Sequence, residues 1–283
     1  MGIARETAVF VVVAAAVVAL LVGLLLHARR RGHAGRARLA ATLTAIVAAF
    51  SIAFVAYTST YYHADESALA SLESTDTVQV QALEGGGWAF IPSQPDGSGV
   101  VLYPGAKVEP ASYAPLAQRI AEQGVTCVIT DPPFNFAIFD IQAATRAERQ
   151  LPQVESWCVG GHSLGGVAAS QYASSNAASL SGLVLLASYS ATDLTKTGLP
   201  TLSIYGTEDK VLNMKQYRDS EKNLAKAPEE LVITGGCHAY FGSYGTQSGD
   251  GSPTITRDAQ QEETAQAIAA FALAHAGTTG QGA

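Results

Sequence analysis

The stretch VGGHSLGG, residues 159–166, places Ser163 among four glycines, directly behind the apolar run SWCV. Glycines leave almost no side chain around this hydroxyl, which suits a reactive group better than a packed core. The segment GHSLG within it matches G-x-S-x-G, the pattern in which a serine nucleophile stands on a tight turn between a strand and a helix. The pattern alone is common by chance, so the elements on either side of it decide its meaning.

Strand-like and helix-like runs alternate from Thr77 onward. Strands are expected at 78–83, 88–92, 100–105, 126–131, 156–161, 181–188, 200–206 and 230–236, and helices at 113–123, 142–151, 164–175, 213–225 and 257–275. Continuous apolar strands separated by helices are typical of a parallel sheet covered on both faces. The sequence therefore predicts an α/β domain with a mostly parallel, doubly wound sheet of about eight strands.

Two further titratable residues follow strands in the order that a serine nucleophile requires. Asp209 comes after PTLSIYG, and His238 comes after ELVITGG. A serine hydroxyl needs a base and the base needs an orienting acid, in the chain order serine, acid, histidine. Glu208 is the neighbouring alternative to Asp209, and the sequence does not decide between them. We take Ser163, Asp209 and His238 as the candidate catalytic residues.

Each of these residues has a simpler interpretation when it is taken alone. His238 would then be an ordinary loop histidine, and Asp209 a turn former or a helix cap. Of the six histidines, however, only His238 ends a core strand, while His162 lies inside the serine turn with its side chain expected to point away from the serine. The coincidence of strand, turn and reactive residue at three places favours the catalytic interpretation.

An acyl-transfer site also needs N–H donors for the negatively charged oxygen that forms during the reaction. The N–H of Leu164 is one candidate, and the N–H of Ala106, in the loop VVLYPGAKVEP, is the other. Lys107 in the same loop is either a substrate contact or a solvated lysine. In the segment DPPFNFAIF, Phe134 and Phe136 are candidates for the pocket that binds the acyl group, with core packing as the equally good alternative.

Two long apolar runs precede the α/β region. Residues 8–26 carry no charge, and residues 39–57 are interrupted only by threonine and serine hydroxyls. Each is nearly long enough for a helix to cross a hydrocarbon core of about 30 Å. We expect a two-helix membrane anchor over residues 1–58, with a cleaved signal peptide as the alternative interpretation of the first run.

The loop between the two runs, 27–38, contains Arg29, Arg30, Arg31, Arg36 and Arg38. The positive-inside rule places such a loop in the cytoplasm, so both chain ends are expected on the other side of the membrane. The expected organisation is a two-pass cell-membrane protein. A polar linker at 59–76 leads to an extracytoplasmic catalytic domain at 77–275, followed by a flexible tail at 276–283.

Composition restricts the partners and cofactors. The net charge of −7 argues against a nucleic-acid partner, which needs a basic face. Cys127, Cys158 and Cys237 are widely spaced and odd in number, so no disulfide framework is predicted. The sequence lacks the ligand clusters typical of a metal site. The expected partners are a small-molecule ester substrate and the lipid bilayer, with no metal or organic cofactor.

Taken together, YPGAK, GGHSLGG, LSIYGTED and GGCHAYFGSYGTQSGDG resemble the α/β-hydrolase superfamily, in particular the membrane-anchored bacterial group known as α/β-hydrolase fold-5. The resemblance covers about residues 77–275. It implies the α/β-hydrolase fold and a triad at Ser163, Asp209 and His238, but no particular substrate. Cys237 stands where an asparagine is expected before the histidine, a change beside the base. The loop FGSYGTQSGDG has no assigned role.

The expected activity is that of a serine hydrolase that cleaves carboxylic esters through an acyl-enzyme on Ser163. An acyltransferase with the same triad and a membrane-tethered binding module without turnover are the alternatives. The connection SYSATDLTKTGL is too short for the helical lid that buries long acyl chains in many hydrolases. We therefore expect a minimal lid, an open cleft and a preference for short acyl groups.

Overall fold

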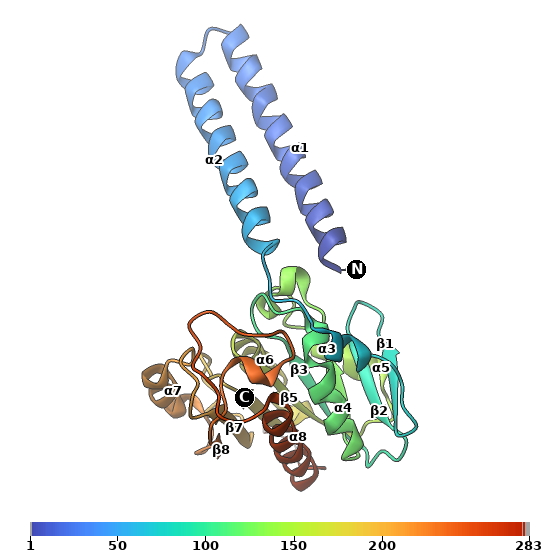
Figure 1. The fold of residues 1–283 in the computed structure, drawn as a ribbon. Coiled ribbons are helices and arrows are strands. Elements are labelled where there is room, and N and C mark those ends of the chain that lie inside the picture. Colours follow the sequence, from blue (N-terminus) through green and yellow to red (C-terminus); the bar gives the residue numbers. More distant parts are fainter. Residues whose placement is uncertain (1, 279, 281–283) are drawn as a thin grey trace. The chain divides into compact units, whose positions relative to one another are not determined.

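The computed structural model describes residues 2–278 and 280 of a chain that divides into two compact units, with the boundary between Tyr61 and Tyr62. The first unit is a helical hairpin of α1 (Gly2–Arg30) and α2 (Ala34–Thr58), which run antiparallel (Figure 1). The ring of Phe10 packs against that of Phe54, with 4.7 Å between centroids. Most of the expected basic loop is helical, since only residues 31–33 lie between the two helices.

Both helices have the length and composition of membrane spans. The apolar segments are Ala8–Arg30, with 23 residues, and Ala34–Thr58, with 25 residues. At 1.5 Å per residue each is about 35 Å long or more, which exceeds a hydrocarbon core of about 30 Å. The hairpin is therefore long and apolar enough to cross a membrane twice.

The second unit is built on a sheet of eight strands in the order β1-β2-β4-β3-β5-β6-β7-β8. The strands are β1 (Val78–Ala82), β2 (Trp88–Pro92), β3 (Ser98–Tyr103), β4 (Thr126–Ile129), β5 (Ser156–His162), β6 (Leu180–Leu186), β7 (Thr201–Gly206) and β8 (Glu229–Ile233). The pairs β1–β2 and β2–β4 are antiparallel, and all the other pairs are parallel. The predicted mostly parallel sheet is confirmed.

Helices cover both faces of this sheet, as expected from strands that are apolar on both sides. They are α3 (Glu66–Ala70), α4 (Ala114–Glu122), α5 (Ala143–Gln150), α6 (Leu164–Asn176), α7 (Met214–Ser220) and α8 (Arg257–Ala274). Along β3, Val100 and Leu102 belong to the core that includes α4 and α8, whereas Val101 and Tyr103 belong to the core that includes α5 and α6. The period of two along a strand thus divides the buried residues between two layers.

The ends of the second unit differ from the expected linker and tail. Within 59–76, the N–H of Tyr62 donates to the carbonyl of Lys107 at 2.7 Å, and Asp65 caps α3. This stretch is therefore part of the folded unit from Tyr62 onward. Of the expected tail, residues 279 and 281–283 lie outside the described residues, and the N–H of Gly280 donates to the carbonyl of Leu180 at 3.0 Å.

The parallel topology determines where a site can form. The carboxyl ends of β3, β5, β6, β7 and β8 lie at one edge of the sheet, because these neighbouring strands run in the same direction. The loops that follow them carry Ala106, Ser163, Asp209 and His238. The connection from β6 to β7, residues 187–200, contains no helix, so no helical lid is inserted there.

Candidate active site

Ser163 stands on a strained turn between β5 and α6, with φ 53° and ψ −122°. A non-glycine residue adopts such a positive φ only when the surrounding structure enforces it. A Cβ on Gly161 would lie 2.3 Å from the carbonyl carbon of Gly165, and a Cβ on Gly165 would lie 2.1 Å from the carbonyl oxygen of Tyr103. Both glycines are therefore required by close backbone approach, and the turn has the shape of a nucleophile elbow.

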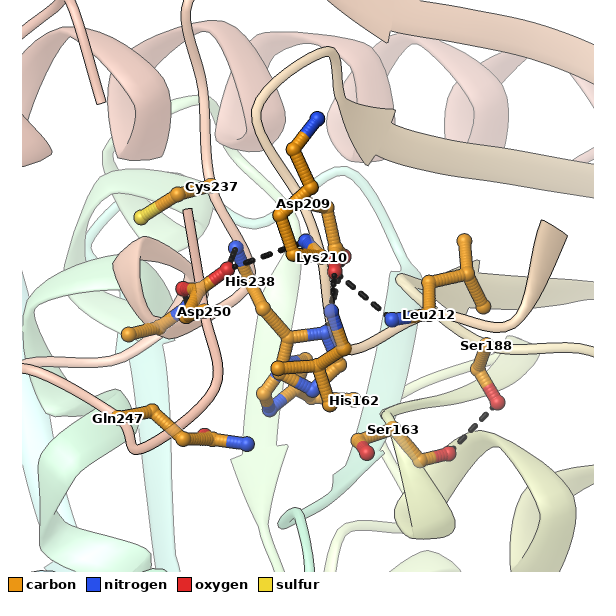
Figure 2. A network of polar contacts seen from close by, with 12 residues as sticks. His162, Ser163, Ser188, Asp209, Lys210, Leu212, Cys237, His238, Gln247 and Asp250 are labelled. Atoms are coloured by element: carbon orange, nitrogen blue, oxygen red, sulfur yellow. Dashed lines mark hydrogen bonds and ion pairs between the residues drawn. The ribbon is translucent and has the colours of Figure 1, made fainter. Parts of the chain in front are cut away.

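The backbone of this turn is held from β6 and the residues after it. The N–H of Ser163 donates to the carbonyl of Leu186 at 2.9 Å, and the hydroxyl of Ser188 donates to the carbonyl of Ser163 at 2.6 Å (Figure 2). Ala187, between these two partners, also has a positive φ of 45°. Hydrogen bonds to Leu186 and from Ser188 thus hold the serine turn at the edge of the sheet.

The acid and the base form a buried pair. Nδ1 of His238 lies 2.9 Å from Oδ2 of Asp209, and both side chains are 1% exposed. The other carboxylate oxygen, Oδ1 of Asp209, accepts the N–H groups of Val211 and Leu212, each at 2.8 Å. These bonds fix the carboxylate with one oxygen free for the imidazole. The structure therefore pairs Asp209, rather than Glu208, with His238.

This pairing leaves the second ring nitrogen of His238 available as a base. A carboxylate only accepts hydrogen bonds, so Nδ1 carries the proton that it shares with Asp209. Nε2 is buried and has no hydrogen-bond partner among the described residues. His238 and Ser163 line the same cavity. The arrangement provides the serine, base and acid that acyl transfer requires.

Both candidate oxyanion donors lie in suitable backbone positions. Leu164 is the first residue of α6, so its N–H has no acceptor within the helix, and the helix dipole favours negative charge there. The N–H of Ala106 has no hydrogen-bond partner among the described residues. A Cβ on Gly165 would lie 2.6 Å from the carbonyl oxygen of Pro104, so the loop that carries Ala106 packs directly against the serine turn.

Tyr113 connects the loop that carries Ala106 to the turn that carries Ser163 and Leu164. Sequence reasoning missed this role. The hydroxyl of Tyr113 accepts the N–H of Gly105 at 3.0 Å and lies 2.7 Å from Nδ1 of His162. The ring of His162 in turn packs on the ring of His238, with 4.5 Å between centroids. The expectation that His162 points away from the serine omitted this contact with the base. Burial, and then the charge of His238, hold the pKa of His162 well below its ordinary value.

A cavity of about 230 Å³ opens beside the serine. Its lining comes from the serine turn, from the loop after β6, from the segment between Asp209 and α7, and from His238: Ser163, Leu164, Val167, Ala187, Ser188, Tyr189, Val211, Leu212, Asn213, Gln216 and His238. Most of the surface that lines the cavity is apolar. Tyr189 and Gln216 add a polar pair, in which the tyrosine hydroxyl donates to Oε1 of Gln216 at 2.8 Å. Apart from Ser163, Leu164 and His238, the sequence indicated none of these lining residues, because they come from separate segments of the chain.

Phe134 and Phe136 do not line this cavity. They pack with Phe139, at 6.3 and 5.9 Å between ring centroids. Lys107, half-buried in the neighbouring loop, is tied by its N–H to the carbonyl of Asn135 at 2.9 Å. The aromatic segment therefore lies beside the loop of Ala106, and the pocket next to the serine is formed by other residues.

The remaining titratable groups indicate no second reactive centre. Within residues 2–278 and 280, no group of three or more His, Cys, Asp and Glu side chains is placed to hold a metal ion. Cys127, Cys158 and Cys237 are buried free thiols. Burial raises the pKa of Cys158 to about 11 and, together with the charge of Asp250, that of Cys237 to about 12. These thiols are therefore protonated near neutral pH and are poor nucleophiles.

Known proteins share both the sequence pattern and the fold. The pattern of the alpha/beta hydrolase family matches residues 99–262. Among solved structures, a Thermus thermophilus protein is similar at 17% identity and a TM-score of 0.51, over 70% of this chain and 97% of that one. The apo form of Thermogutta terrifontis esterase 2 is similar at 14% identity and a TM-score of 0.51, over 72% and 96%. No curated protein matches the chain by sequence.

Proposed function

The chain belongs to the alpha/beta hydrolase family, and we propose that it is a serine hydrolase that cleaves carboxylic esters through an acyl-enzyme on Ser163. The observation that carries the proposal is that Ser163 and His238 line one cavity while Asp209 pairs with His238. Ser163 stands on a strained turn, and His238 presents an unpartnered Nε2 while Asp209 holds its Nδ1 at 2.9 Å.

Each step of the proposed reaction is assigned to a group of the candidate site. Nε2 of His238 removes the proton of Ser163 as Oγ attacks the ester carbonyl, and the N–H groups of Ala106 and Leu164 bind the negatively charged oxygen. Asp209 stabilises the imidazolium, which then gives its proton to the departing alcohol. A water molecule, activated by His238, attacks the acyl-enzyme and releases the acid. Ser163 is regenerated when the imidazolium returns its proton.

We propose short acyl groups as the preferred substrates. The cavity beside Ser163 is only about 230 Å³, and residues 187–200 contribute no helix that would extend its cover. A long chain would leave most of its methylenes in water and would lose about 0.8 kcal/mol of binding for each of them. We expect the alcohol portion to be less restricted.

We also propose that the α1–α2 hairpin anchors the enzyme in the cell membrane with the catalytic unit outside the cytoplasm. The turn at 31–33 contains Arg31, and the helix ends on either side of it carry Arg29, Arg30, Arg36 and Arg38. Short arginine-rich connections are retained in the cytoplasm. Both ends of the hairpin, and the unit that begins at Tyr62, then face the other side.

The decisive experiment is labelling of the full-length protein with a fluorescent fluorophosphonate, which reacts with activated serines. We expect labelling of the wild type and none of Ser163→Ala, with Ser175→Ala, an exposed serine of α6 outside the cavity lining, as the control that retains the label. A correctly folded wild type that never labels would favour a binding module. Products formed with and without an added alcohol acceptor then distinguish hydrolysis from acyl transfer.

A further inference from the structure

Asp250 lies in the loop FGSYGTQSGDG, residues 241–251, and its carboxylate touches the loops of both triad partners. We propose that Asp250 is a positioning residue for the triad, which holds the loop of Asp209 and the loop of His238 in register. This inference rests on the proposed function, because it assigns Asp250 a role in the same site.

Four backbone N–H groups converge on this one carboxylate. Oδ1 of Asp250 accepts from His238 at 3.2 Å, from Lys210 at 3.4 Å and from Gly251 at 2.8 Å. Oδ2 accepts from Ala239 at 2.8 Å. Figure 2 shows the carboxylate beside both loops, facing His238 from the side opposite Ser163. One side chain therefore binds the residue after the acid, the base itself and the residue after the base.

The position matters because the acid and the base come from different strands. Asp209 follows β7 and His238 follows β8, so their 2.9 Å contact depends on how the two loops lie relative to each other. Near the Asp209–His238 pair, few backbone hydrogen bonds join the loop after β7 to the loop after β8. One is donated by the N–H of Glu208 to the carbonyl of Gly236 at 2.8 Å. Bonds from N–H groups to a charged carboxylate are stronger than those to neutral acceptors. Asp250 thus adds a second connection between the two loops, through the bonds from Lys210 and His238.

The neighbours of Asp250 support the same role. A Cβ on Gly251 would lie 1.9 Å from the carbonyl oxygen of Glu208, so the chain at this point lies directly on the acid loop. Earlier in the loop, the N–H of Ser243 donates to the carbonyl of Ser112 at 2.7 Å. The ring of Tyr244 packs on that of Tyr62, with 5.4 Å between centroids. Contacts with Ser112 and Tyr62 therefore hold the first part of the loop in place, and Asp250 follows a few residues later.

The unusual Cys237 fits this arrangement. Burial and then the nearby charge of Asp250, with a hydrogen bond between the two side chains, raise the pKa of the thiol. A protonated thiol donates to the carboxylate, as the amide of an asparagine at this position would. The thiol of Cys237 is therefore a candidate donor to Asp250.

The test is Asp250→Asn in the full-length protein, compared with Asp96→Asn. The matched control also removes a loop carboxylate, one that accepts the N–H of Ser98 at 2.7 Å but lies outside the candidate site. Asparagine keeps the shape of the side chain, but its NH₂ group faces an N–H that needs an acceptor. We expect kcat per labelled serine to fall by about 10–100-fold, as for other residues that orient catalytic groups, with KM changed by less than about threefold. We expect no such change in Asp96→Asn.

Counting active sites with the fluorophosphonate separates positioning from simple loss of fold. If Asp250→Asn loses folded sites while each remaining site keeps the wild-type kcat, Asp250 is only structural and the proposal is wrong. The second measurement is the low-field proton resonance expected for Nδ1–H of His238, which does not depend on ester cleavage. We expect it to shift or broaden in Asp250→Asn and to persist in Asp96→Asn. An unchanged resonance would overturn the proposal.

A double mutant tests whether Asp250 acts through the pair. In an Asp209→Asn background, Asp250→Asn is expected to cost less than about threefold in kcat, because the contact that it supports is already disrupted. A full additional 10–100-fold loss would contradict the proposal. Failure of the proposed function is distinguished from these outcomes, because then Ser163→Ala would retain labelling and activity. A variant series centred on Cys237 adds an independent check: Cys237→Ala should lower kcat, and Cys237→Asn should restore it.

Discussion

The hydroxyl of Tyr113 lies 2.7 Å from Nδ1 of His162, and it connects the loop of Gly105 and Ala106 to the turn that carries the serine. The same hydroxyl accepts the N–H of Gly105, so it donates its own proton to His162. The neutral His162 then carries its proton on Nε2, on the side of the ring away from Tyr113. Tyr113 is 2% exposed, and this link therefore lies in a region from which water is excluded.

Tyr113→Phe is expected to lower the free energy of unfolding by about 1–3 kcal/mol, because it leaves the buried N–H of Gly105 and Nδ1 of His162 without partners. The measurement is denaturant unfolding of the full chain in detergent, followed through the fluorescence of Trp88 and Trp157 in the second unit. The control is Tyr240→Phe, at a half-buried tyrosine whose hydroxyl has no hydrogen-bond partner among the described residues. Equal stability of the two variants would contradict the expected role of Tyr113.

Stability is expected to fall as the pH falls below about 6.5, with His162 as one cause. Burial and the charge of His238 lower the pKa of His162 in the folded protein. The unfolded chain therefore binds a proton in this range that the folded chain does not bind, which favours unfolding. One such proton contributes at most about 1.4 kcal/mol per pH unit. Unfolding measured between pH 7 and pH 5 should show a shallower decline in His162→Asn, whereas parallel curves would exclude this linkage.

Ser163→Ala and His238→Ala are each expected to remove ester hydrolysis. Triad members act as a unit, so the double variant should be hardly slower than either single variant. The Ser163→Ala protein should keep its stability, since the serine side chain makes no hydrogen bond that the structure describes as holding the turn, whereas its backbone does. Steady-state rates with p-nitrophenyl acetate test the first expectation. Full activity in Ser163→Ala would end the triad assignment.

Catalytic efficiency is expected to be highest for short acyl chains. The cavity beside Ser163 is small, and each methylene left in water loses about 0.8 kcal/mol of binding. A series of p-nitrophenyl esters from acetyl to palmitoyl, measured in the full-length protein, tests this. If catalytic efficiency were highest for long acyl chains, the expectation would be wrong, and some other part of the protein would have to cover the chain.

Protease added to intact spheroplasts is expected to digest the catalytic unit and to spare the hairpin. Under the proposed topology, the arginines around the 31–33 turn keep that turn in the cytoplasm, and we expect residues from Tyr62 onward to be exposed outside. Replacement of Arg29, Arg30 and Arg31 by glutamine should weaken this orientation. Protection of the catalytic unit until the membrane is lysed would show the opposite topology.

Local sequence patterns determined most of the fold. The eight strands and the helices α4 to α8 lie close to the runs read from apolar periodicity, because residues buried on both faces of a parallel strand must be apolar whatever their partners are. The positions of Ser163, Asp209 and His238 after strands were also visible, since each combines a strand, a turn and a reactive group within a few residues. The order of the strands in a parallel sheet then brings such loops to one edge.

Tertiary structure alone decided the contacts between those loops. Nothing near Asp209 in the sequence distinguishes it from Glu208, and only the approach of the β7 and β8 ends places Oδ2 of Asp209 on His238. The same is true of Tyr113 on His162 and of Asp250 on the base, which pair residues from distant parts of the chain. Phe134 and Phe136 resemble pocket residues by composition, yet the pocket came from other loops. Periodicity records which face of an element is buried, whereas a side-chain contact depends on distances between elements that no local pattern contains.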